Sequence, residues 1–549
     1  MQKKGKLELT WVGKYDVQEL EPRILVEDES KSYGDNDTGC MLIHGDNLLA
    51  LRALENDFSG KIQCVYVDPP FNTGQAFDFY DDNVEHSIWL NLIHDRLAIM
   101  YRLLKKNGVL WMHLDDVEVH YCKVMLDEVF GRQNFVSHIT YERSAVAGLG
   151  QGGYLVNTTE HILLYKKGIL PEKVNYSYEE VGFNIIKRYN RFVSNFGTRK
   201  LIKEFKAKSN GEMVRIYEHS GVDIVTISLR DAQNREEEIK QLFAQHIETL
   251  FRGNRVQKEN AFQNDIITQL DKNKFYSVDY VPSRGKYKDE ETTLYYFNCE
   301  LLSWLKDTTT LTEGKMTKSQ KMTTLWKHGE IPKADIANEG GVYFPRSKKP
   351  EQLLRRIIDM STEPGDYVLD SFLGSGTTAA TAHKMGRKWI GIEMGEHAYT
   401  HCQIRLCNVV NGEQTGISKS VNWHGGGGFK FFELAEPLLV KNPKLPVYQI
   451  NPSYTFDMVA EAICKIEGFT YAPEGEFHGH SSENRFIHVT MEFVNMKYIQ
   501  SLMKNLGEHQ SLLIYCKRMQ SDMNLPVNVE VRRIPKDLLN KCNFEEVQE

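Results

Sequence analysis

The stretch Lys61-Ile-Gln-Cys-Val-Tyr-Val-Asp-Pro-Pro-Phe-Asn-Thr-Gly74 decides the fold of this chain. Its residues Ile62–Val67 are short, mostly apolar and rich in β-branched side chains, which predicts a strand buried on both faces of a parallel sheet. Two prolines then end the strand, because proline lacks a backbone N–H and has a fixed φ. The sequence therefore predicts a rigid turn at the carboxyl end of a parallel strand, where open α/β sheets bind ligands.

This turn offers groups that suit a planar base. The Asp68 carboxylate and the Pro69 carbonyl would be two fixed acceptors, which match a group with two N–H donors such as the exocyclic amine of adenine. The Phe71 ring would lie beside them, against the face of the base. A Pro-Pro turn with an aspartate cap explains the same residues without any ligand, so the rest of the chain has to decide between the two interpretations.

Length and composition indicate an ordinary protein of several domains. The 549 residues correspond to roughly three or four domains, and 41% hydrophobic and 26% charged residues are typical of soluble proteins. The sequence shows neither a secretory signal nor a run of the ~18 apolar residues that span a bilayer. Nine scattered cysteines without a CxxC pair indicate reduced thiols. We therefore expect a cytoplasmic protein without membrane contact, and a net charge of −7 means that any nucleic-acid-binding face is local.

Strands and helices alternate in two separate parts of the chain. Strands are expected near residues 41–46, 62–67, 109–114, 367–370 and 387–393, and helices near 48–54, 87–104, 117–130, 351–360 and up to about 408. This alternation predicts a doubly wound α/β sheet.

The second decisive stretch is the glycine turn Ser371-Phe-Leu-Gly-Ser-Gly-Thr-Thr378, which follows the strand that ends at Asp370. Its glycines let the backbone approach a ligand, and Glu393 ends the next strand where an acid can accept from a ribose hydroxyl. Asp46 also ends a strand, where it either accepts from a ligand or caps the next helix. The glycines fit the dinucleotide pattern GxGxxA, but a dehydrogenase has no need of a distant Asp-Pro-Pro-Phe turn.

Residues 171–334, between the two halves, lose the alternation of strands and helices. Aromatic residues there are interleaved with lysines and arginines, which suits phosphate contacts and base recognition, although solvated helices and loops have the same composition. The aromatic residues in question are Tyr189, Phe192, Phe196, Tyr276, Tyr280 and Tyr287.

The last part of the chain follows the flexible turn Trp423-His-Gly-Gly-Gly-Gly-Phe429, which predicts a domain boundary. Residues 429–549 resemble a separate small α/β domain, with strands near 486–490, 511–515 and 527–531. His478, His480 and His488 lie in this part, but no cysteine or carboxylate spacing there supports a metal site.

Taken together, the two motifs resemble the amino-methyltransferases that methylate adenine N6 in DNA with S-adenosylmethionine. The Asp-Pro-Pro-Phe turn precedes the Phe-x-Gly-x-Gly turn, which is the permuted order of the β class, with a target-recognition domain between the halves. Further stretches resemble more specifically the Mod subunit of type III restriction-modification systems. These are Asn72-Thr-Gly74, His113-Leu-Asp-Asp116, Lys349-Pro-Glu-Gln-Leu-Leu354 and the four glycines before Phe429. Such families more often carry Tyr at the position of Phe71, and Ser in place of Asp68 would have suggested cytosine N4.

The resemblance implies a fold, a domain order and a site. The fold is a Rossmann-like, permuted S-adenosylmethionine-dependent methyltransferase sheet. The implied domains are an N-terminal arm (1–38), a catalytic half (39–170), a target-recognition domain (171–334), a cofactor half (335–425) and a C-terminal α/β domain (426–549). The implied catalytic residues are Asp68, Pro69, Pro70 and Phe71. The implied cofactor residues are Asp46 at the adenine amine, Glu393 at the ribose, Asp370, Phe372, Gly374 and Gly376 at the amino-acid end, and also Lys349 and Thr377. No metal is implied.

The resemblance also implies double-stranded DNA as substrate, a homodimer, and an ATP-dependent restriction (Res) subunit as partner in a prokaryote or phage. No helicase P-loop occurs, so any ATP-driven step would belong to another chain. Two alternatives remain: a stand-alone methyltransferase without a nuclease partner, and a DNA-recognition protein with a silent catalytic fold. The intact Asp68 and glycine turn favour an enzyme. The sequence does not reveal the DNA target site.

Overall fold

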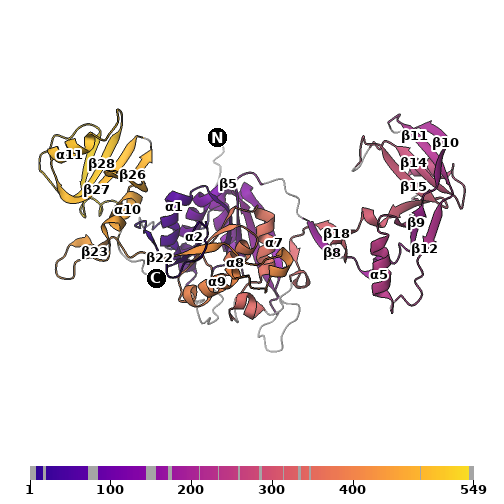
Figure 1. Cartoon of the computed structure of the whole chain (residues 1–549), viewed down its shortest axis with the longest axis horizontal. Coiled ribbons are helices and arrows are strands. Elements are labelled where there is room, and N and C mark those ends of the chain that lie inside the picture. The colour runs from indigo at the N-terminus through magenta and orange to yellow at the C-terminus, as the bar shows by residue number, and fades with distance from the viewer. Residues whose placement is uncertain are drawn as a thin grey trace. The chain divides into compact units, whose positions relative to one another are not determined.

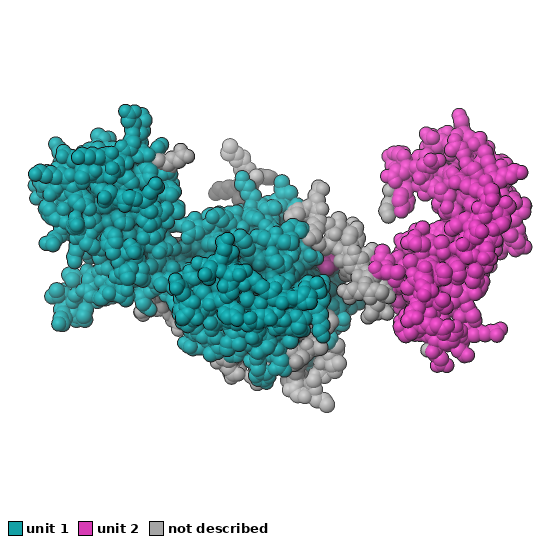
Figure 2. Space-filling model, viewed as in Figure 1, with its two compact units in different colours: residues 1–173, 323–549 teal, residues 174–322 magenta. Residues whose placement is uncertain are grey.

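The computed structural model forms two compact units, residues 1–173 with 323–549 (unit 1) and residues 174–322 (unit 2), which Figure 2 colours separately. It describes residues 8–16, 20–71, 85–143, 156–170, 176–208, 210–232, 234–256, 260–283, 287–312, 315–331, 336–344, 348–482, 484–542 and 544. Within these ranges, no helix is both long and apolar enough to span a membrane.

Unit 1 is built on an 11-stranded sheet (Figure 1). Its strand order is β1-β22-β3-β21-β20-β4-β5-β7-β6-β19, with β2 added on β22. The strands from β22 to β5 run parallel, while β7 is antiparallel to both β5 and β6. The strands are β1 (Leu25–Glu27), β2 (Tyr33–Gly34), β3 (Met41–His44), β4 (Ile62–Val67), β5 (Leu104–Leu114), β6 (Phe135–Glu142), β7 (Thr159–Lys166), β19 (Leu325–Trp326), β20 (Tyr367–Asp370), β21 (Lys388–Glu393) and β22 (Gly428–Leu434).

Helices cover both faces of this sheet, which confirms the predicted doubly wound α/β fold. Alternate residues of the strands enter two cores because successive side chains point to opposite faces. Val65 and Val67 join the core under α1, α2 and α3, whereas Cys64 and Tyr66 join the core under α7, α8 and α9. These helices are α1 (Asn47–Phe58), α2 (His86–Leu103), α3 (Val119–Leu126), α7 (Glu351–Ser361), α8 (Thr377–Lys384) and α9 (Ile404–Val410).

Strands β4 and β20 are neighbours in the sheet although about 300 residues separate them in the chain. Their register pairs Val368 with Cys64 and Leu369 with Val65. Because the paired strands are parallel, the turns after β3, β21, β20, β4 and β5 all lie at the same edge of the sheet. The Asp-Pro-Pro-Phe turn and the glycine turn therefore follow adjacent strands.

Unit 2 contains an eight-stranded antiparallel sheet and a three-stranded sheet, in the orders β10-β11-β14-β15-β16-β13-β9-β12 and β17-β18-β8. Its elements are β8 (Tyr176–Glu180), α4 (Phe183–Ile186), β9 (Arg191–Asn195), β10 (Thr198–Lys206), β11 (Met213–Ser220), β12 (Asp223–Thr226), α5 (Glu236–Gln245), β13 (Leu250–Asn254), α6 (Ala261–Ile267), β14 (Phe275–Tyr280), β15 (Thr292–Phe297), β16 (Glu300–Trp304), β17 (Thr310–Thr312) and β18 (Lys315–Lys321). Three of the aromatic residues expected on a nucleic-acid face, Tyr189, Phe192 and Tyr276, are buried instead and belong to its cores.

The C-terminal part of unit 1 contains a five-stranded sheet, β25-β26-β27-β28-β29, and the hairpin β23-β24. The three strands expected there are present as β27, β28 and β29, which pair in parallel. The elements are β23 (Leu439–Lys441), β24 (Tyr448–Ile450), α10 (Phe456–Ile466), β25 (Thr470–Glu474), β26 (Phe477–Ser482), β27 (Arg485–Val494), α11 (Met496–Met503), β28 (Ser511–Met519) and β29 (Val529–Arg533). In the described part of the chain, no group of three or more His, Cys, Asp or Glu side chains is arranged to hold a metal.

The structure corrects three expected boundaries. The core does not end at residue 425, because β22 begins at Gly428, the last of the four glycines, and pairs with both β1 and β3. The insertion ends near residue 322 rather than 334, because β19 pairs with β6 and buries Trp326 in the core of unit 1. The strand expected at 109–114 begins at Leu104 instead, directly after α2, because Leu104 already pairs with Ile62.

Candidate active site

The Asp-Pro-Pro-Phe turn leaves β4 at the edge of the sheet where the other turns gather. Asp68 is the first residue after the strand, and its side chain is 18% exposed. The Trp89 indole N–H of α2 donates to the Pro70 carbonyl at 2.8 Å, which fixes the turn from the helical layer. The two prolines and this hydrogen bond hold the Asp68 carboxylate and the Pro69 carbonyl on a rigid backbone.

A buried cation lies between two carboxylates at this turn. Lys349 precedes α7, and its Nζ lies 3.3 Å from Asp68 Oδ1 and 3.3 Å from Glu160 Oε2 of β7. Asp68 Oδ1 is buried, and no described group gives it a well-directed hydrogen bond. The contact to Lys349 is therefore a loose ion pair to a buried carboxylate oxygen.

Glu160 continues this arrangement into the sheet. His113 Nε2 of β5 lies 2.8 Å from Glu160 Oε2, and His113 Nδ1 lies 2.8 Å from the Tyr66 hydroxyl. His113 thus links Glu160 to Tyr66, with one ring nitrogen directed toward each side chain. Arg143 adds a second cation, 3.6 Å from Glu160 Oε1.

Burial and charge act in opposite directions on the pKa values here. Burial raises the pKa of Asp68 above its ordinary value, although Lys349 and His113 oppose the rise. Burial also works against the charged form of Glu160, but Lys349 and His113 overcome it and hold its pKa well below the usual range. Burial likewise works against the charge on Lys349, yet Asp68 and Glu160 raise its pKa. Lys349 is therefore a cation and Glu160 an anion at neutral pH.

The Phe71 ring lies beside these charges. Lys349 Nζ is 4.6 Å from the ring centroid, and the His113 ring centroid is 6.1 Å away. A cation above an aromatic face is a favourable contact. The structure thus places Lys349, which was expected among the cofactor residues, in contact with the Asp-Pro-Pro-Phe turn.

The glycine turn folds around Asp370. Asp370 Oδ1 accepts from the Phe372 N–H at 2.9 Å, and Oδ2 accepts from the Thr378 hydroxyl at 2.6 Å. Gly374 and Gly376 have φ values of +56° and +78°, a region that favours glycine. Burial raises the pKa of Asp370 to about 7, although Thr378 and Phe372 oppose the rise.

Glu393, at the end of β21, hydrogen-bonds to the same turn. Its Oε2 accepts from the Gly374 N–H at 2.7 Å, and its Oε1 accepts from the Gly395 N–H at 3.0 Å. His397 Nε2 lies 3.0 Å from Oε1. The observed contacts of Glu393 hold the turn in shape, and its expected contact with a ribose stays a prediction.

Asp46 makes the helix cap that was one of its two interpretations. Its Oδ1 accepts from the Leu49 N–H at 2.9 Å, at the start of α1. Its Oδ2 pairs with Arg96 of α2 at 3.1 Å, and Arg96 also donates to the Asn47 side chain. Asn47 in turn donates to the Ser371 carbonyl at 2.7 Å. The contacts of Asp46, Arg96 and Asn47 therefore extend to the glycine turn.

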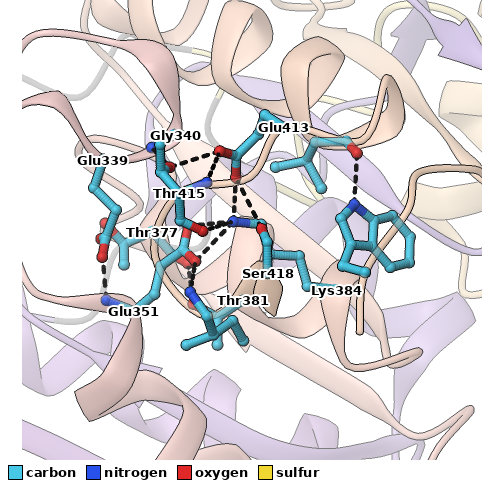
Figure 3. Close-up of polar contacts among 12 residues, drawn as sticks. Glu339, Gly340, Glu351, Thr377, Thr381, Lys384, Glu413, Thr415 and Ser418 are labelled. Carbon is cyan, nitrogen blue, oxygen red and sulfur yellow. Dashed lines mark hydrogen bonds and ion pairs between the residues drawn. The ribbon is translucent and has the colours of Figure 1, made fainter. Parts of the chain in front are cut away.

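Thr377 faces a buried ion network below the glycine turn, rather than an open surface. Its hydroxyl accepts from Arg405 at 2.8 Å, and Arg405 lies 2.8 Å from Glu351. Figure 3 shows Lys384 between Glu351 and Glu413 in this network. The buried charges tie α7, α8 and α9 together directly behind the turn.

The buried Ser371 hydroxyl has no hydrogen-bond partner among the described residues. It lies between Asp370 and Phe372, at the start of the glycine turn. An unpaired polar atom at a sheet edge is the feature expected where a polar ligand completes the hydrogen bonding. The residues present therefore fit a cofactor with amine and hydroxyl groups.

Sheet pairing brings together most of the residues expected at the site. The Asp-Pro-Pro-Phe turn, Asp46, Asp370, Glu393 and the glycine turn all lie at one edge, whereas Thr377 points into the network behind it. Sequence patterns did not reveal Glu160 and Arg96. Glu160 lies on an antiparallel strand that the βα pattern did not predict, and Arg96 lies within a helix whose apolar face gave the only signal.

Comparison with known proteins identifies the family. The family model of DNA methylases matches residues 62–403, more than half of the chain, and the chain therefore belongs to this family. The HindVI Mod subunit of Haemophilus influenzae, a probable type III restriction-modification enzyme, is 36% identical over 413 residues, which cover 72% of this chain and 54% of that protein. The type III EcoPI Mod subunit of Escherichia phage P1 is 22% identical, over 70% of this chain and 62% of that protein. The chain thus spans little more than half the length of these relatives.

Among solved structures, the cytosine-N4-specific PvuII DNA methyltransferase is similar at 14% identity, with a TM-score of 0.29. The match covers 71% of this chain and 90% of that one. At so low an identity and TM-score, the fold is established by the strand order of the chain itself.

Proposed function

We propose that this chain is a site-specific DNA methyltransferase that transfers a methyl group from S-adenosylmethionine to N6 of a flipped-out adenine. The observation that carries the proposal is the pairing of β4 with β20, which places a rigid acceptor turn next to a glycine turn with an unpaired buried hydroxyl. Membership of the DNA methylase family supports it.

The residues of the chain divide the work between binding and positioning. Adenine has to leave the duplex, which costs a few kcal/mol, and stacking on Phe71 offsets about 1–3 kcal/mol. Asp68 and the Pro69 carbonyl accept from the two N6 hydrogens, which aims the nitrogen lone pair away from the ring. The amine loses one proton overall, and the Asp68 carboxylate is the acceptor beside it. Rigid placement matters because transfer requires the reacting atoms to be about 3–3.5 Å apart.

The glycine turn would hold the cofactor, which supplies an electrophilic methyl group when bound. Asp370 and Glu393 provide carboxylates, and Ser371 provides a free hydroxyl. Their existing hydrogen bonds to Phe372 and Gly374 keep the turn in one conformation. A preformed turn lowers the entropy lost on binding.

The choice of adenine rests on the family resemblance of a turn that begins with Asp68, because a carboxylate accepts equally from the amine of cytosine. Digestion of methylated DNA to nucleosides, followed by mass spectrometry, tests it. N6-methyladenine is the expected product, and N4-methylcytosine as the main product would refute the assignment.

Unit 2 is proposed to recognise the DNA sequence. Its edge strand β10 is exposed along most of its length, and a pocket between β10 and α6 carries three lysines and two phenylalanines. The pocket lysines are Lys203, Lys206 and Lys208, and the phenylalanines are Phe205 and Phe262. Lysines suit phosphate contacts that fix register, and aromatic rings suit base contacts.

Replacing residues 174–322 with the corresponding segment of a relative should change the methylated sites and leave cofactor affinity nearly unchanged. An unchanged site in an active chimera would contradict this role.

We also propose that the chain is the modification and recognition subunit of a type III restriction-modification system, which acts as a homodimer with an ATP-dependent restriction subunit. The similarity to the HindVI and EcoPI Mod subunits supports this assignment. Light scattering of the purified chain tests the dimer, and co-purification with a co-expressed restriction subunit tests the partner. A monomer that methylates DNA and binds no such subunit would favour the stand-alone enzyme.

A further inference from the structure

Two acidic side chains share one lysine at the catalytic turn. Lys349 is 11% exposed, and its ammonium is equally distant, at 3.3 Å, from Asp68 and Glu160. Glu160 is more deeply buried, at 4% exposure, and also contacts His113. Such a group is expensive to bury unless its charges are balanced.

Lys349 and Glu160 have opposite effects on the ionisation of Asp68. The ammonium favours the ionised form of Asp68, whereas the negative charge of Glu160 disfavours it. A carboxylate without a cation would hold its proton and lose acceptor capacity toward an incoming amine. A carboxylate with a cation of its own would be held by that cation and would accept less well from an incoming amine. Sharing the lysine avoids both extremes.

We propose that Lys349 and Glu160 are positioning residues for Asp68: Lys349 keeps Asp68 ionised, and Glu160 draws the ammonium back so that the Asp68 carboxylate keeps its capacity to accept from the substrate amine. The inference deepens the proposed methyl transfer and rests on it. Glu160 also gives the ammonium a place to remain when a base takes over the Phe71 face that Lys349 now covers.

The charged and titratable groups around Asp68 come from every element packed against it. They are Tyr66 on β4, His113 on β5, Glu160 on β7, Asp370 on β20 and Lys349 before α7, while Arg143 after β6 contacts Glu160. Of these, Lys349 and Glu160 can be exchanged for uncharged side chains of similar size. The two exchanges should move the titration of Asp68 in opposite directions.

The experiment is infrared titration of the full chain with isotope-labelled aspartate, in which the difference from an Asp68→Asn chain isolates the Asp68 carboxyl band. Lys349→Met should raise the midpoint by about one pH unit or more, because the cation is removed. Glu160→Gln should lower the midpoint, because a nearby anion is removed. Lys349→Arg retains the cation and should restore a midpoint near that of the wild type.

A matched control is available at the opposite end of the same strands. Lys105 pairs with Asp366 at 2.6 Å, just after the start of β5 and just before β20. Lys105→Met also removes a lysine from an ion pair with an aspartate, but it should leave the Asp68 midpoint unchanged. If the loss of any lysine–aspartate ion pair shifted the Asp68 midpoint, Lys105→Met would shift it as well.

Methyl transfer from labelled S-adenosylmethionine into unmodified DNA supplies the second measurement. In Lys349→Met the acidic limb of the kcat profile should move to higher pH, whereas Glu160→Gln should chiefly raise KM for DNA. Midpoints that do not move, or that move in the same direction in both variants, would overturn the inference. Absence of methyl transfer by the wild type would refute the proposed function instead, and the infrared midpoints would still decide what Lys349 and Glu160 do to Asp68.

Discussion

Asp370→Asn is predicted to stabilise unit 1 at alkaline pH while it weakens cofactor binding. Asp370 is buried at the end of β20, and burial raises its pKa from 3.8 to about 7. A carboxyl group whose pKa is higher in the folded state stabilises the fold below its unfolded pKa, and this contribution disappears as pH rises through about 7. Asparagine does not ionise, so the variant escapes this effect.

The size of the effect follows from the pKa difference. A shift from 3.8 to about 7 corresponds to about 4 kcal/mol of unfolding free energy between low pH and pH 8. Part of this loss has already occurred at pH 5, because the contribution of Asp370 begins to fall near its unfolded pKa of 3.8. The advantage of the variant over the wild type should therefore grow by about 3 kcal/mol from pH 5 to pH 8. Comparing the two pH values cancels changes in the hydrogen bonds to Thr378 and Phe372 that do not depend on pH.

Urea unfolding followed by tryptophan fluorescence measures this difference. Trp304 lies in unit 2, and the other tryptophans of the chain lie in unit 1, so a Trp304→Phe background makes the signal specific for unit 1. Calorimetric titration with S-adenosylmethionine in the same background should show weaker binding to the variant, because the proposed cofactor site loses a carboxylate.

Two results would refute the reasoning. An advantage of the variant that is equal at pH 5 and pH 8 would show that Asp370 does not titrate between them. A variant that is less stable at pH 8 would show that the Asp370 carboxylate is favourably solvated in the fold. Unchanged cofactor affinity would separately exclude Asp370 from the cofactor site.

Three further outcomes are expected. Asp68→Ala should abolish methyl transfer and leave S-adenosylmethionine binding within a few fold, because the proposed role of Asp68 is to contact the base; a tenth of normal activity in a radiolabel assay would contradict that role. Lys384→Met should lower the unfolding free energy of unit 1 by about 3–5 kcal/mol, because Glu351 loses a buried partner, and urea unfolding at an unchanged midpoint would contradict the ion network. Changing the three pocket lysines of unit 2 to alanine should weaken binding to all DNA sequences and reduce the salt dependence by about one unit of slope for each phosphate that is no longer neutralised. Binding isotherms at several salt concentrations measure this slope, and an unchanged slope would place the phosphate-binding residues elsewhere.

Local sequence patterns determined the elements on which the site is built. The apolar run Ile62–Val67 and the prolines after it are sufficient for a buried strand that stops at Asp68, and the structure has that strand with these bounds. The glycine turn could also be predicted from the sequence, because the positive φ values at Gly374 and Gly376 favour glycine. Both features depend on the backbone preferences of neighbouring residues, so they can be recognised without the rest of the fold.

Tertiary structure alone decided which side chains meet. The antiparallel strand β7 carries Glu160 to Lys349, nearly 190 residues away in the chain, and no local pattern records such a pairing. It also decided that Asp46 caps a helix and pairs with Arg96, that Thr377 faces Arg405, and that β22 completes the sheet after the glycine-rich turn. The physical reason is that burial and ion pairing depend on which strands are neighbours in the sheet, and strand order is set by the packing of the whole unit rather than by adjacent residues.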